Sequence, residues 1–93
     1  MTTHAIAMLR VTDPDSLSAY RNVAADALAR HGGAVVQASP DPAVLEGSPV
    51  QPDIMALLRF PDRDSAQAWI DDPALEPIHA LRRGAGSSDI LLF

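Results

Sequence analysis

Apolar residues along this chain alternate between short strand-like runs and stretches with helical spacing. Residues 4–11 form the first run, which is apolar on both faces and therefore suits a strand in a sheet covered on both sides. Asp13-Pro14 then predicts a helix start, because Asp caps free N–H groups and Pro fits the first helical turn. Gly32-Gly33 predicts the end of that helix. Between these signals, the residues expected on one buried helical face recur at three- and four-residue spacing: Leu17, Tyr20, Ala24, Ala27, Leu28 and His31.

Three more strands and a second helical region are expected further along the chain. The strands are placed at 34–39, 53–60 and 88–93, and the helical region at 63–71 and 74–83, with an interruption at Asp72-Pro73. The resulting order β-α-β-β-α-β is the split ferredoxin-like motif. The expected fold class is α+β, with one ferredoxin-like domain over residues 1–93 and a four-stranded antiparallel sheet of strand order 4-1-3-2.

An eleven-residue stretch occurs twice, which predicts a duplicated strand–helix–strand unit. Residues 10–20 align without a gap on residues 59–69, with Arg, Asp, Asp, Ser and Ala recurring in register and an aromatic residue ending each copy. Tyr20 and Trp69 therefore hold matching helix positions. Each of them either anchors its helix to the sheet or presents its polar group to a cavity as a ligand-binding residue.

The helices of this fold cover one face of the sheet, and the sequence leaves the other face rich in apolar residues. A bare apolar face of that size is typical of an interface. Two copies packed sheet against sheet would close into a barrel and protect the strand edges. We therefore expect a homodimer of the dimeric α/β-barrel type.

Composition and charge exclude several classes of function. Seven basic and twelve acidic residues give a net charge of −5, and no basic face for a nucleic acid is evident. The absence of cysteine excludes a disulfide framework and a thiolate nucleophile. No signal peptide and no apolar stretch of about 20 residues is seen, so we expect a cytoplasmic protein without a membrane partner. Three separated histidines make a poor metal site, and no phosphate-binding glycine loop is present, so neither a metal nor a cofactor is expected.

Arg10, Asp53 and Asp89 form the most suggestive polar set. Antiparallel pairing would put the end of the first strand beside the starts of the third and fourth strands, so Arg10 would lie near both carboxylates. Arg10 could then hold an anionic or enolate-like substrate while a carboxylate acts as base. The alternative is an ordinary cross-strand ion pair at the rim of the barrel. With His4, which begins the first strand and could face the barrel mouth, the catalytic candidates are Arg10, Asp89 and His4, and the ligand-binding candidates are Tyr20, Asp53 and Trp69.

The other two histidines have structural interpretations. His31 lies at the end of the first helix, where it is either a cap at the negative end of the helix dipole or a general base. His79 falls late in the second helical region and is expected at the surface or at the dimer edge.

An ordered set of short segments gives the chain a family resemblance. The segments are Val11-Thr12-Asp13-Pro14, Tyr20, His31-Gly32-Gly33, Val44-Leu45-Glu46-Gly47, Arg59-Phe60-Pro61, Ala68-Trp69, Asp72-Pro73, Leu81-Arg82-Arg83 and Ser88-Asp89. In this order the chain resembles the bacterial domain-of-unknown-function 1330 family of the dimeric α/β-barrel superfamily. The resemblance implies a homodimer of ferredoxin-like subunits without an established activity. Arg59 stands where the family often has an acidic residue, and Ile70 and Leu75 stand where it often has aromatic ones, which implies a less aromatic pocket.

Two functions fit these observations. The first, by analogy with enzymes of the dimeric α/β-barrel superfamily and from the enclosed barrel, is a cofactor-independent enzyme (a cyclase, isomerase or monooxygenase) that acts on a hydrophobic or polyketide-like compound of secondary metabolism. The alternative is a non-catalytic dimer that binds a small hydrophobic or anionic ligand or supports an assembly. A barrel interior with a pocket lined by Arg10, Asp89 or His4 would favour the enzyme. An interior filled by apolar side chains would favour the non-catalytic dimer, and the expected residues are Ile6, Met8, Ile54, Leu58 and Leu91.

Overall fold

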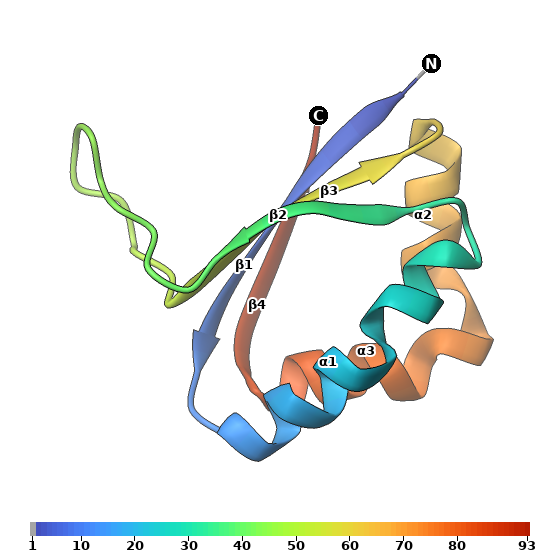
Figure 1. Ribbon diagram of the computed structural model, residues 1–93, viewed down its shortest axis with the longest axis horizontal. Helices are drawn as coiled ribbons and strands as arrows, with labels where there is room; N and C mark the ends of the chain where they lie inside the picture. The colour runs from blue at the N-terminus through green and yellow to red at the C-terminus, as the bar shows by residue number, and fades with distance from the viewer. Residues whose placement is uncertain (1) are drawn as a thin grey trace.

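The computed structural model describes residues 2–93 as four strands and three α-helices, with one short 3-10 turn. In chain order the elements are β1 (Thr3–Val11), α1 (Pro14–Ala29), β2 (Ala34–Ser39), β3 (Ile54–Phe60), α2 (Arg63–Asp71), η1 (Pro73–Leu75), α3 (Glu76–Gly84) and β4 (Gly86–Leu92). The strands form one antiparallel sheet in the order β2-β3-β1-β4, and the helices lie together on one side of it (Figure 1). This arrangement confirms the predicted ferredoxin-like fold and its strand order.

The duplicated sequence produces the same local structure in both halves of the chain. Asp13 caps α1, because its carboxylate accepts hydrogen bonds from the backbone N–H groups of Asp15 and Ser16 at 3.1 and 3.2 Å. Asp62 caps α2 in the same way and accepts from the N–H of Ser65 at 2.7 Å. Both interactions satisfy backbone donors that the first helical turn leaves free.

One face of the sheet packs against the helices and forms the core. In the register of β1 with β3, Ala5 pairs with Leu58, and both residues are buried beneath the helices. Because side chains alternate along a strand, Ile54 and Leu58 share this face. The expectation that these two residues fill a barrel interior together with Ile6 and Met8 is therefore wrong: Ile6 pairs with Leu57 on the opposite face.

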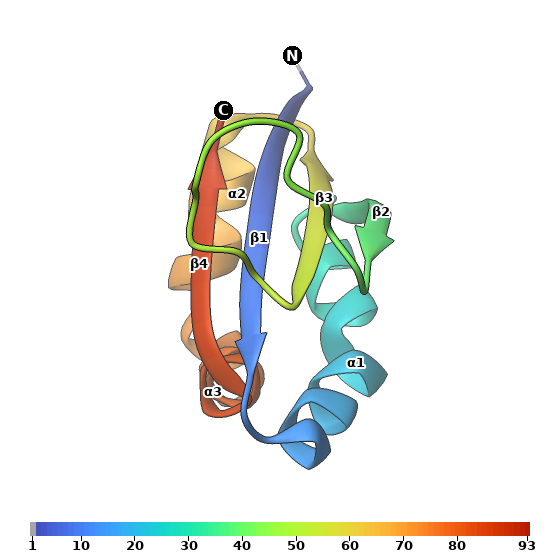
Figure 2. The same ribbon diagram turned by 90° about the vertical axis from the view of Figure 1, so that its left-hand side faces the viewer.

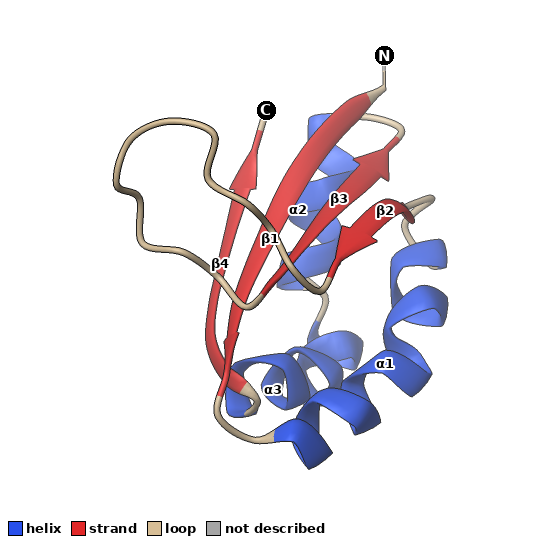
Figure 3. Cartoon of the chain, turned by 60° about the vertical axis from the view of Figure 1, so that its left-hand side comes forward, coloured by secondary structure: helices blue, strands red, loops and turns tan. Residues whose placement is uncertain are grey.

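The opposite face of the sheet, here called the open face, carries no helix (Figure 2). Several of its apolar side chains are accessible, including Met55 at 39% and Leu91 at 65% exposure. The segment 40–53 between β2 and β3 crosses in front of β1 and β4 on this side (Figures 2 and 3). Within that segment Leu45 is completely exposed and Val50 is 78% exposed. An accessible apolar surface of this kind is a feature of interfaces.

None of the helices within residues 2–93 is both long enough and apolar enough to cross a membrane.

Candidate functional site

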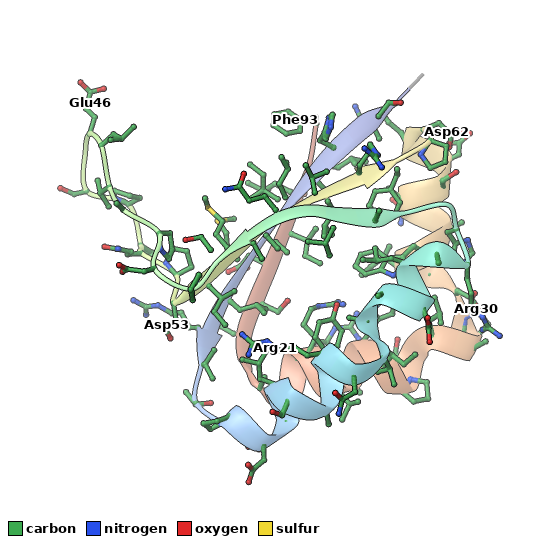
Figure 4. All side chains as sticks on the ribbon, viewed as in Figure 1. Arg21, Arg30, Glu46, Asp53, Asp62 and Phe93 are labelled. Atoms are coloured by element: carbon green, nitrogen blue, oxygen red, sulfur yellow. The ribbon has the colours of Figure 1, made fainter. Side chains whose placement is uncertain are left out.

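A cleft of about 230 Å³ lies between α1 and the helix-facing side of the sheet. Its walls are mostly aliphatic, and many of the lining positions are small: Ala7, Ala24, Ala25, Ala38 and Ala56. The polar side chains that line it are Tyr20 and Arg21 from α1 and Arg82 from α3, with the ring of Trp69 from α2. Arg21 is exposed and projects from α1 at the mouth of the cleft (Figure 4). The cleft therefore combines apolar walls with a small number of polar groups.

Arg82 is the central polar residue of this cleft and is only 3% exposed. Its Nε donates to Ser88 Oγ at 3.1 Å, and its Nη1 donates to His79 Nδ1 at 2.8 Å and to the hydroxyl oxygen of Tyr20 at 3.5 Å. The guanidinium carbon lies 5.6 Å from the ring centroid of Tyr20 and 5.3 Å from that of Trp69. Within residues 2–93 no carboxylate forms an ion pair with this guanidinium.

His79 holds Arg82 from the same helix and is fully buried. Its Nε2 lies 2.9 Å from the carbonyl oxygen of Trp69. Since a carbonyl can only accept, Nε2 carries the proton and Nδ1 is the acceptor for Arg82. Burial lowers the pKa of His79 below its usual value, and the nearby charge of Arg82 adds to this effect against the opposing hydrogen bond to Trp69. The imidazole is therefore neutral at neutral pH.

Trp69 is 3% exposed and is one of the residues that line the cleft. Its ring packs edge-on against His79 at 4.8 Å and tilted against Phe60 at 5.6 Å, measured between centroids. Its indole Nε1 is buried and has no hydrogen-bond partner among the described residues. Buried donors are nearly always paired, so this unpaired indole N–H is an exception within the described residues.

The sequence-predicted residues Arg10 and Asp89 lie on the open face, away from this cleft. They line a hollow of about 450 Å³ together with Val50 and Pro52 from the crossing segment. In the register of β1 with β4, Asp89 pairs with Met8, whereas Arg10 pairs with Ser87. Asp89 and Arg10 are therefore diagonal neighbours on the same face of the sheet, not a directly opposed pair. Across residues 2–93 no ion pair joins Arg10 to Asp89. Arg10 Nε instead donates to the carbonyl oxygen of Gln51 at 3.4 Å.

Asp53 and His4 lie at opposite ends of β1, Asp53 beside its last residues and His4 within its first ones. The carboxylate of Asp53 accepts from the backbone N–H of Val11 at 2.8 Å, and its own N–H donates to the carbonyl of Leu9 at 2.8 Å, which fastens the start of β3 to β1. His4 lies at the beginning of β1, with its ring edge-on to Phe93 at a centroid distance of 6.3 Å. Six residues along a strand span about 20 Å, so the structure does not bring His4 together with Arg10.

Tyr20 and Trp69 do share one cleft, but the sequence reasoning missed the residues that connect them. The expectation that His79 is at the surface or a dimer edge is wrong, because its side chain is inaccessible. Arg82 and Ser88 entered the sequence argument only as family-like segments. The available signal was spacing: His79 and Arg82 are three residues apart and thus share one helix face.

His31 behaves as a structural residue. Its Nε2 lies 2.9 Å from Asp72 Oδ2, and this contact joins the end of α1 to the break after α2. The hydrogen bond to His31 is the main reason that the pKa of Asp72 is lowered, and a second bond from the N–H of Ala74 adds to it. Within the described part of the chain, no group of three or more His, Cys, Asp or Glu side chains is arranged to hold a metal ion.

The βαββαβ order, the single antiparallel sheet and the helices on one face define a ferredoxin-like protein. The chain belongs to the family described as Domain of unknown function (DUF1330), whose model matches residues 2–93. None of the curated proteins compared with the chain matches it.

Solved structures share the fold at low sequence identity. A protein of unknown function from Rhodopseudomonas palustris has a TM-score of 0.73 and 20% identity, over 99% of this chain and 80% of that one. SnoaB, a cofactor-independent oxygenase from Streptomyces nogalater, has a TM-score of 0.70 and 17% identity, over 99% of this chain and 90% of that one. A dimeric ferredoxin-like protein of unknown function from Jannaschia sp. CCS1 has a TM-score of 0.74 and 12% identity, over 100% of this chain and 98% of that one. At these identities the likeness shows the fold alone.

Proposed function

We propose that this protein binds a small hydrophobic metabolite in the cleft between α1 and the sheet and transforms it without a cofactor, as an oxygenase, cyclase or isomerase. The observation that carries the proposal is Arg82, a buried guanidinium without a carboxylate partner among the described residues, in the lining of a mostly apolar cleft. Apolar walls with a few fixed polar groups are the usual composition of a small-molecule site. The fold likeness to a cofactor-independent oxygenase supports this class of function.

The volume of the cleft limits the size of the ligand. An apolar cavity of about 150 Å³ accommodates benzene. The cleft, at about 230 Å³, therefore suits a compound of one or two rings better than a large polycyclic one. The polyketide-like substrate expected from the family resemblance is accordingly narrowed to a smaller ring system.

Arg82 would supply the chemistry of the cleft. Reactions of this class begin by forming an enolate or phenolate, and a fixed guanidinium in a water-poor cleft stabilises the developing negative oxygen. The hydroxyl of Tyr20, which accepts from Arg82, is placed to exchange a proton with the ligand.

A homodimer closed over the open face is the second part of the proposal. The exposed Met55 and Leu91 support it, and so do two solved structures of similar fold that are described as dimeric. In such a dimer the hollow of Arg10 and Asp89 would lie inside the barrel, where the pair either ties the rim or contacts a ligand, with His4 at the far end of the same face. Light scattering at micromolar concentration should give the mass of two chains.

A non-catalytic binding protein is the alternative function, and one observation favours it. Both ring nitrogens of His79 are already engaged, by Trp69 and Arg82, so the imidazole beside the cleft has no lone pair left to act as a base. Such a protein would bind the same ligands without turning them over.

Proton exchange distinguishes the two functions. The protein is incubated in D2O with 2-tetralone, a two-ring ketone that exchanges its C1 protons through an enolate, and the exchange is followed by NMR. An enzyme should accelerate exchange above the buffer rate, and Arg82→Met should remove the acceleration. Arg83→Met, which makes the same charge change on an exposed neighbour, is the matched control. Calorimetric binding without acceleration would identify the non-catalytic alternative, and the absence of binding by all one- and two-ring ketones tested would refute the assignment of the cleft.

A further inference from the structure

We infer that the ligand of the cleft is an organic anion, a compound of one or two rings whose ionised oxygen pairs with Arg82. This inference rests on the proposed function and specifies the chemical class of the ligand. The shared chemistry is an oxyanion on a hydrophobic body, which a carboxylate or an ionised enol can provide.

The distribution of charge gives the first reason. The chain has twelve acidic and seven basic residues. Against that excess, two arginines, Arg21 and Arg82, line the cleft, and no Asp or Glu among the described residues does. A hollow of one charge sign with low-dielectric walls concentrates ions of the opposite sign. The cleft is therefore an electropositive depression in an acidic protein.

The missing partner of Arg82 gives the second reason. Its neighbour Arg83 is exposed and pairs with Glu76 at 2.7 Å. Arg82 is buried, and all three of its hydrogen-bond partners (Ser88, His79 and Tyr20) are uncharged groups. Buried charges are normally paired, because removing an ion from water costs several kcal/mol. The more costly position is thus the one without a counter-ion, which a bound anion would supply.

The geometry around Arg82 gives the third reason. Ser88 and His79 hold Nε and Nη1, and within residues 2–93 Nη2 has no hydrogen-bond partner. The rings of Tyr20 and Trp69 lie at 5.6 and 5.3 Å from the guanidinium carbon and restrict its movement. Nη2 is therefore the guanidinium nitrogen that remains to donate to a bound oxyanion, while the neighbouring groups hold the other nitrogens in place. This donor is oriented before the ligand arrives, which lowers the cost of binding.

Ligands of matched shape test the inference. Calorimetry compares 2-naphthoate with 2-naphthamide, which has nearly the same outline but no charge, and adds 2-hydroxy-1,4-naphthoquinone, which is an enolate-type anion at neutral pH. A charge-assisted hydrogen bond predicts that at least one anion binds about tenfold to a hundredfold more tightly than the amide. Which anion binds more tightly distinguishes a carboxylate ligand from an enolate ligand.

Variants then assign the preference to Arg82. Arg82→Met should bring the affinity for the anions down to that for the amide, whereas Arg83→Met, on the exposed side of the same helix, should leave the preference intact. The fluorescence of Trp69, the sole tryptophan, reports whether the ligand enters the cleft. If Arg82→Met does not fold, the anion-to-amide ratio of the unmodified protein still decides the matter. Equal binding of anion and amide would overturn the inference while leaving the proposed function standing. If none of the three compounds binds, both are overturned.

Discussion

The neutral, buried state of His79 predicts how stability depends on pH. The folded imidazole accepts from Arg82 through Nδ1 at 2.8 Å. Protonation would place a hydrogen on that nitrogen, break the bond and set two cations side by side. Burial, reinforced by the charge of Arg82, therefore keeps the folded pKa of His79 below its ordinary value of 6.5.

The sign of the effect follows from linkage between proton binding and folding. Below pH 6.5 the unfolded chain takes up a proton at His79 that the folded chain does not, so acid stabilises the unfolded state. The contribution of His79 is complete above that pH and is lost as pH falls toward the folded pKa. One proton corresponds to at most about 1.4 kcal/mol per pH unit, so between pH 7.5 and 5.5 His79 should lower the unfolding free energy by an amount up to about 1.4 kcal/mol.

Urea unfolding at a fixed protein concentration, repeated across this pH range, measures the loss. His79→Gln can still donate to Trp69 and accept from Arg82 but does not titrate, so its stability should lack this pH-dependent part. His4→Gln and His31→Gln remove imidazoles elsewhere and should retain it. If the His79→Gln protein lost stability with acid as steeply as the unmodified one, the neutral, buried imidazole would be refuted.

Three further predictions concern packing and the open face. Trp69→Ala should cost about 3–5 kcal/mol of unfolding free energy because the ring is 3% exposed, while Tyr20→Ala should cost clearly less because that ring is half-buried; chemical denaturation showing the reverse order would contradict their placement. Gly86→Ala should lower the melting temperature strongly, because a Cβ there would overlap the carbonyl of Arg10, whereas Gly84→Ala meets only the Ser16 hydroxyl at 3.3 Å; equal thermal stability of the two variants would rule out the close approach. Arg10→Ala should cost at most about 1 kcal/mol if Arg10 only ties the barrel rim, and a larger loss in denaturant titrations would indicate a buried role in the dimer.

Much of the fold could be predicted from the sequence because it is encoded locally. Helix starts at Asp13 and Asp62 depend on a side chain that bonds its own next turn, and strand positions depend on runs of apolar residues. The duplication supplied the topology, since two strand–helix–strand units in tandem give the observed order. The helix caps and the apolar runs are each properties of a few consecutive residues.

The candidate site could not be predicted in the same way. A charged residue late in a helix is normally at the surface, but Arg82 is buried because α3, which follows the break at Asp72, packs against α1 and β4. The side of the sheet on which Ile54 lies depends on strand register, which is set by pairing across the sheet rather than by local sequence. Tertiary packing therefore determines the residues that form the candidate site.

The alanines that line the cleft suggest how this scaffold could change its ligand. Ala24 and Ala25 on α1 face Ala7, Ala38 and Ala56 on the strands, so the empty space exists because side chains are short on both walls, and the backbone need not bend to create it. Exchanging any one of them for valine or leucine would reduce the volume of the cleft by the volume of the added methyl groups. The helix caps, the strand register and Arg82 would stay in place. A set of point substitutions could thus vary the size of the proposed ligand along a lineage, or in a laboratory library, while Arg82 stays unchanged.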